Sequence, residues 1–104
     1  MALTMTRTRT QTTLTKLAQL VAEAHGELVF VERLLTEMPE HREVLVARKA
    51  LLVGERDALY AALRQFDPEM SPEEIGESDG WRKKLMPRVR KHWVRYYLVR
   101  IAVI

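Results

Sequence analysis

The sequence has no cysteine among its 104 residues, which excludes several kinds of chemistry at once. Disulfide bridges, thiolate metal sites and cysteine nucleophiles all require a thiol. The four glycines are scattered, at positions 26, 54, 76 and 80, so no glycine-rich phosphate loop exists. The three histidines form no His-Glu-x-x-His zinc motif. We therefore expect a protein that is not an enzyme and that binds no metal or cofactor.

Long hydrophobic runs are also missing. No stretch approaches the roughly 18 consecutive apolar residues of a membrane-spanning helix, and the polar run 8–13 does not suit a secretory signal. Hydrophobic residues nevertheless make up 47% of the chain and charged residues 30%, which is typical of one small globular domain. These features predict a cytoplasmic protein.

The net charge of the chain is +3, but the charged residues are distributed unevenly along the sequence. Residues 67–80 hold six acids and no base, whereas residues 81–104 hold eight bases and no acid. Such segregation indicates partners more directly than the overall pI. Four parts are predicted: a flexible Thr-rich arm at 1–12, a helical hairpin at 13–66, an acidic linker with a short helical turn at 67–80, and a basic aromatic segment at 81–104. A dimer-forming strand is the alternative for the arm.

Apolar residues at alternating spacings of three and four predict a long helix from Leu14 to Met38. Pro39 ends this helix because the residue before a proline disfavours helical dihedrals. A second helix with a seven-residue apolar repeat runs to Phe66, and the short link makes the two helices antiparallel neighbours. The predicted hairpin seam consists of Leu14, Leu17, Val21, Leu28, Val31, Leu35, Leu45, Leu52 and Leu59.

Apolar residues outside this seam, such as Phe30 and Val46, need a further cover. Either the C-terminal segment or a second copy of the chain supplies it, and we favour a homodimer. The predicted fold class is thus all-α: a long, coiled-coil-like antiparallel hairpin followed by a basic amphipathic helix or a short strand. His25, at the edge of the seam, is expected to be an interface histidine with satisfied hydrogen bonds.

The acidic linker contains a helix-start signal, with Ser71 as N-cap and Pro72 at the first helical position. Its six acids are most simply a solvated connection. The alternative is that they fold back onto the basic segment and shield it.

The basic segment mixes cations with aromatic residues. On one continuous helix, four cations would form a row opposite the aromatic face, although Pro87 would kink that helix or mark its first turn. The predicted nucleic-acid contacts are Arg82, Lys83, Lys84, Arg88, Arg90, Lys91 and Arg95. The aromatic residues for packing or stacking are Trp81, Trp93, Tyr96 and Tyr97.

Three interpretations of this segment stay open. The aromatic face covers the hairpin as a third core helix while the cations are merely solvated. Alternatively, the cationic row follows phosphates while aromatic rings stack on exposed bases. In the third interpretation, the segment lies on a membrane surface.

The run 63–69 reads Leu-Arg-Gln-Phe-Asp-Pro-Glu, Pro72 and Ile75 follow, and 81–84 is Trp-Arg-Lys-Lys. Over about residues 50–84 the chain thereby resembles a group of small uncharacterised bacterial coiled-coil proteins, in which a Phe-Asp-Pro motif precedes a basic segment. The acidic insertion before the basic run and the hydrophobic end depart from that pattern. The resemblance implies no activity and favours nucleic-acid binding.

Together these patterns predict a non-enzymatic, oligomerising helical module whose basic tail binds DNA or RNA electrostatically. The alternative is a structural scaffold protein whose C-terminal segment completes the core or docks a protein partner or a membrane surface.

Overall fold

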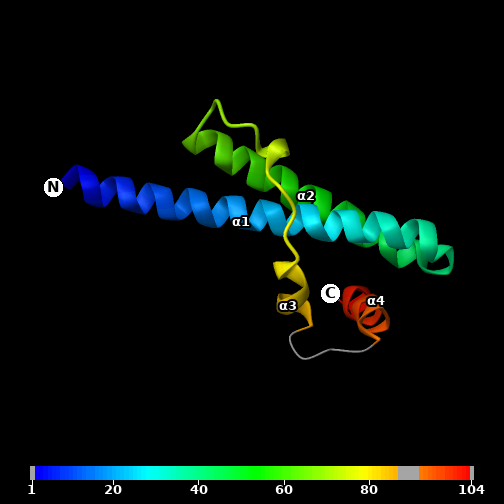
Figure 1. Cartoon of the computed structure of the whole chain (residues 1–104). Coiled ribbons are helices and arrows are strands. Elements are labelled where there is room, and N and C mark those ends of the chain that lie inside the picture. Colours follow the sequence, from blue (N-terminus) through cyan, green and yellow to red (C-terminus); the bar gives the residue numbers. More distant parts are fainter. Residues whose placement is uncertain (1, 87–91, 104) are drawn as a thin grey trace.

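The computed structural model describes residues 2–86 and 92–103, with side chains from residue 9 onward (Figure 1). Within these residues the chain forms only helices and turns, so the all-α prediction is confirmed. The elements are α1 (Ala2–Glu37), the 3-10 turn η1 (Pro39–His41), α2 (Arg42–Phe66), the 3-10 turn η2 (Pro72–Glu74), α3 (Gly80–Leu85) and α4 (Trp93–Val103). No helix in the described part of the chain is both long and apolar enough to cross a membrane.

The two long helices pack against each other as the predicted antiparallel hairpin (Figure 1). Five seam residues are buried: Val21, Leu28, Val31, Leu45 and Leu52. The other four are half-buried: Leu14, Leu17, Leu35 and Leu59. All nine residues are thus at least half-buried, and burial is deepest in the middle of the hairpin.

Both predicted helix ends after the seam are confirmed. α1 ends at Glu37, and Met38 leaves helical geometry with φ −132° and ψ 66°. Its neighbour Pro39 opens the η1 turn, where its missing N–H costs nothing. α2 ends at Phe66, and Asp67 is extended with φ −144°.

The predicted arm at residues 1–12 differs from the structure, because α1 already begins at Ala2. Alternating threonines favour a strand only where another strand pairs with them. Here nothing interrupts the helix before Gly26, and extending an existing helix costs far less than starting one. The alternation at residues 1–12 was therefore a misleading signal.

The acidic linker returns along the hairpin, forms η2 and crosses α1 (Figure 1). The crossing is close: the Ser78 N–H donates to the Ala22 carbonyl over 2.9 Å. A Cβ at Gly26 would lie 2.0 Å from the Ser78 carbonyl oxygen. Glycine at position 26 thus permits the linker to reach the side of the hairpin on which α3 and α4 lie.

The C-terminal segment forms two helices rather than one. Met86, which precedes Pro87, has φ −138° and ψ 66°, so α3 stops at Leu85. α4 follows His92, whose φ of 54° lies in the left-handed region. The predicted row of cations on one helix face is therefore wrong. Lys84 belongs to α3 and Arg95 to α4, while Arg88 and Lys91 lie outside the described residues.

α3 and α4 complete the core of the hairpin. α4 continues as a helix to Val103, which decides between the predicted helix and strand in favour of the helix. Phe30 and Leu34 of α1 are buried against this C-terminal layer. The layer contributes Trp81, Met86, Tyr97, Leu98 and Ile101 to the same hydrophobic cluster.

Candidate nucleic-acid interface

Four aromatic rings anchor the C-terminal segment on α1. Around Phe30, the ring of Trp93 stacks with a centroid distance of 4.8 Å, and the rings of Tyr97 and Trp81 lie at 5.0 and 5.3 Å. Trp81 and Tyr97 are buried and Trp93 is half-buried, so these rings are used for packing. Tyr96, in contrast, is 61% exposed.

A buried polar cluster lies beside these rings and joins three helices. Arg48 of α2 donates two hydrogen bonds to the Glu27 carboxylate of α1, from Nε over 2.6 Å and from Nη2 over 2.9 Å. The Tyr97 hydroxyl of α4 donates to Oε2 of the same carboxylate over 2.6 Å. Glu27 is only 3% exposed, and this fork geometry satisfies its charge within the core.

The protonation states of this cluster follow from its surroundings. Burial, followed by the hydrogen bond to Glu27, raises the pKa of Tyr97 far above its ordinary value, so the phenol remains a donor. Burial lowers the pKa of Arg48, but hydrogen bonding and Coulomb attraction from Glu27 outweigh it and leave that pKa raised. The cluster is therefore a carboxylate held between a guanidinium and a neutral phenol.

A second buried carboxylate, one helical turn earlier on α1, holds α3. Lys84 Nζ lies 2.8 Å from Glu23 Oε2, and the Glu23 side chain is 8% exposed while that of Lys84 is 60% exposed. A Cβ at Gly80 would lie 2.6 Å from Glu23 Oε1, so the start of α3 fits closely against this carboxylate. Glu23 and Glu27 thus bind α3 and α4 respectively.

Most cations that the structure describes in the hairpin are paired with acids, whereas Lys16 and Arg42 are exposed and pair with no described carboxylate. Among the described cations of the C-terminal segment, Lys84 is the paired one. Five hairpin cations are in ion pairs: Arg33, Arg48, Lys49, Arg56 and Arg64. Four C-terminal cations are exposed and pair with no carboxylate of the described residues: Arg82, Lys83, Arg95 and Arg100. The predicted contacts Arg88, Arg90 and Lys91 lie outside the described residues.

Arg82 is supported by an aromatic ring rather than by an acid. Its guanidinium carbon lies 4.4 Å from the ring centroid of Trp93. This cation–π contact holds the side chain over the half-buried face of the tryptophan and leaves its charge uncompensated. Arg82 therefore combines an ordered position with a free positive charge.

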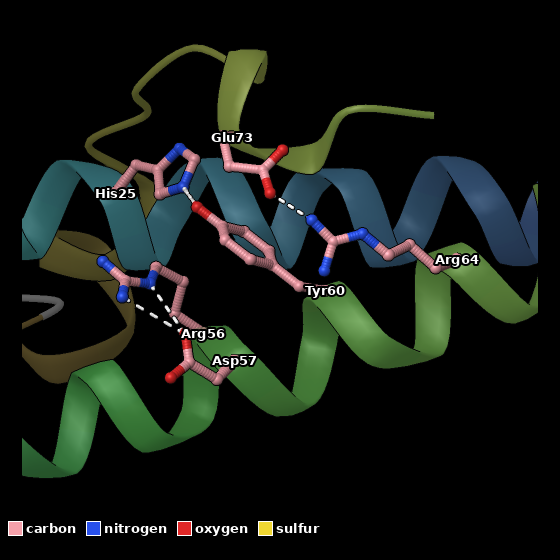
Figure 2. Close-up of polar contacts among 6 residues, drawn as sticks. All are labelled: His25, Arg56, Asp57, Tyr60, Arg64 and Glu73. Carbon is pink, nitrogen blue, oxygen red and sulfur yellow. Dashed lines mark hydrogen bonds and ion pairs between the residues drawn. The ribbon is translucent and has the colours of Figure 1, made fainter. Parts of the chain in front are cut away.

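The acidic linker is fastened to the hairpin instead (Figure 2). Glu73 pairs with Arg64, and among the described residues no linker acid pairs with a C-terminal cation. His25 Nδ1 donates to the Ile75 carbonyl over 2.8 Å, and the Tyr60 hydroxyl bonds to Nε2. His25 thus has both ring nitrogens bonded within the chain, and the shielding alternative finds no ion pair to support it.

Glu23, Glu27 and Arg48 were not among the predicted site residues. The sequence does contain a signal for Glu27, because Glu27 lies seven residues after Leu20 and seven before Leu34. It therefore occupies a position on an apolar face of the helix. Arg48 likewise lies between Leu45 and Leu52 on the seam side of α2. A charged residue at a core position of each facing helix predicts a buried ion pair.

The described residues contain no group of three or more His, Asp or Glu side chains placed to hold a metal ion. Comparison with known proteins gives no match, since no protein-family model, curated protein or solved structure is similar to the chain.

Proposed function

We propose that this protein is a non-enzymatic module that binds nucleic acid through the exposed cations of α3 and α4. One observation carries the proposal. Arg82, Lys83, Arg95 and Arg100 are exposed without carboxylate partners among the described residues, in a segment 81–104 that contains no acid. Cations that the protein itself leaves unneutralised are those that release counterions from a phosphate backbone.

The binding mode follows from the position of the aromatic rings. Trp81 and Tyr97 are buried, and Trp93 is covered by Phe30 and Arg82, so these three rings do not offer faces to bases. Tyr96 is exposed, but stacking on a single ring does not distinguish one base from another. Phosphate contacts fix position without reading sequence. We therefore expect binding that is sensitive to salt and insensitive to base sequence.

The buried carboxylates support this interface indirectly. Glu23 and Glu27 hold α3 and α4 on α1, and the cations project from these two helices. A charged surface on rigid elements loses less side-chain and backbone freedom on binding than one on a loose tail. This cluster is thus a positioning device for the interface.

The test is fluorescence anisotropy with a labelled DNA duplex and a labelled RNA strand. The variant K83Q/R95Q/R100Q removes three exposed C-terminal charges, and the control R9Q/K16Q/R42Q removes three exposed charges elsewhere, so both have the same net charge. We expect only the first variant to change the salt dependence of duplex DNA binding. The slope of the logarithm of the binding constant against the logarithm of the salt concentration should fall in magnitude by up to about 2.7. Equal losses in both variants, or no binding by wild type at low salt, would refute the proposal.

The second candidate function is that of a scaffold whose α4 docks a protein partner or a membrane surface. It is favoured by the exposure of Tyr96, Val99 and Val103, at 61, 61 and 75%. Binding to anionic vesicles but not to nucleic acid would identify the membrane form. The cytoplasmic location stays a prediction.

A further inference from the structure

The C-terminal layer covers only part of the groove between α1 and α2. Beyond Trp81 and Leu85 of α3 the groove stays open, with a volume of about 460 Å³. Its walls are mainly apolar and include Leu20, Ala58 and Leu59. Leu20, which is 36% exposed, lies on this open part of the hairpin.

α4 is apolar on two sides. Tyr97, Leu98 and Ile101 are buried against the hairpin. On the outer side Tyr96, Val99 and Val103 recur at spacings of three and four and are all more than half exposed. A helix that covers a core from the surface needs only one apolar face, and no described residue of the same copy covers the outer stripe.

The open groove and α4 lie on the same side of the hairpin. Glu27 and Arg48 form part of the groove wall, and the same two residues surround the Tyr97 hydroxyl. Figure 1 shows α4 almost end-on while α1 and α2 lie across the view, so α4 crosses the hairpin and raises one half of this side. One half of the surface is therefore raised and apolar, and the other half is hollow and apolar.

We propose that two copies of the chain associate through these halves, each inserting the outer stripe of its α4 into the open groove of the other. A two-fold axis between the raised and hollow halves brings both pairs together at once, as an isologous dimer requires. Each α4 then has one apolar face on its own hairpin and the other on its partner's. This arrangement accounts for both unpartnered surfaces with one contact, and it does not depend on nucleic-acid binding.

The charges around the groove and along α4 are consistent with a second copy of the chain in the groove. Glu55 lines the groove and has no ion-pair partner among the described residues, whereas the other charged lining residues are paired with one another. Arg95 and Arg100 border the outer stripe of α4. Long arginine side chains reach the rim of such an interface, so that one of the two can contact Glu55 of the other copy while the second stays available to phosphates.

Sedimentation of the full-length chain tests the dimer. V99E/V103E places charges in the outer stripe, and V29E/V46E makes the same change at two exposed valines outside the groove and the stripe. We expect dimeric wild type and control but monomeric V99E/V103E with unchanged helical circular dichroism. A monomeric wild type at 100 μM, or equal dissociation of the two variants, would overturn the proposal.

Because the chain lacks cysteine, single cysteines test the contact itself. Chains with V99C are mixed with chains that carry A58C, and the mixture is oxidised. We expect a disulfide-linked V99C–A58C heterodimer in excess over both homodimers. A statistical mixture of the three products would show that dimers, if present, form through another face.

Discussion

At the scale of single residues, Glu27 is the position on which the arrangement of the helices depends most. Its carboxylate accepts hydrogen bonds from α2 and α4 while lying on α1. An apolar residue would fit the seven-residue repeat at this position, but it would bind neither Arg48 nor the Tyr97 hydroxyl. Periodicity identifies where a side chain is buried, whereas the partner of a buried charge depends on which helices meet there.

Replacing Glu27 is therefore expected to cost far more than replacing a surface acid. E27Q leaves the Arg48 charge buried without its counter-charge, and we expect a loss of about 3–5 kcal/mol in the free energy of unfolding. E32Q is the matched control on the same helix, because the Glu32–Lys49 pair is exposed. It should cost less than about 1 kcal/mol. Urea unfolding followed by circular dichroism measures both.

A compensating double variant separates charge from packing. E27L/R48M replaces both charged partners by apolar side chains and should recover part of the stability that E27Q loses, because the buried Tyr97 hydroxyl is still left without its acceptor. If E27Q costs no more than E32Q, Glu27 does not hold the C-terminal segment in the way its hydrogen bonds indicate.

At the scale of elements, local chemistry predicted where helices stop. α1 ends at Glu37 and α2 at Phe66, as expected, and a proline follows each end within two residues. The start of α1 was not predicted, because threonine alternation outweighed helix propagation in the sequence analysis. The division of the C-terminal segment into α3 and α4 was also not predicted. The sequence contained its cause, because the residue before Pro87 disfavours helical dihedrals.

The crossing of the linker over α1 depends on a missing side chain at Gly26. G26A adds a Cβ that would lie 2.0 Å from a backbone oxygen of Ser78, so the linker has to move. Alanine at Gly54 in α2 meets nothing within 4 Å. Since both changes gain about 1 kcal/mol of helix propensity, we expect G54A to stabilise the protein and G26A to destabilise it.

The measurement is again the midpoint of urea unfolding, with circular dichroism as the probe. Opposite signs for the two alanine variants would support the close crossing. Equal stabilisation by both would mean that the linker does not pack against α1 at this position.

At the scale of the whole molecule, the aromatic residues and the cations of the C-terminal segment have separate roles. Composition predicted nucleic-acid contacts in this segment, and its spacing was compatible both with packed and with stacking rings. The decision depends on Phe30, an α1 residue outside the seam, around which three of the four aromatic residues gather. Phe30 was expected to need a cover from either the C-terminal segment or a second copy, and no local pattern joins position 30 to positions 81–97, so spacing could not decide between the two.

The central claim is that three of the four rings of this segment, all except Tyr96, pack inward, while its unpaired cations face outward. One titration tests it, because both tryptophans of the chain, Trp81 and Trp93, belong to this segment. Oligonucleotide is added at low salt while its anisotropy and the intrinsic tryptophan fluorescence are recorded together. The account predicts saturable binding with nearly unchanged tryptophan emission, since neither ring stacks on a base. Absence of binding, or binding accompanied by strong tryptophan quenching, would contradict it.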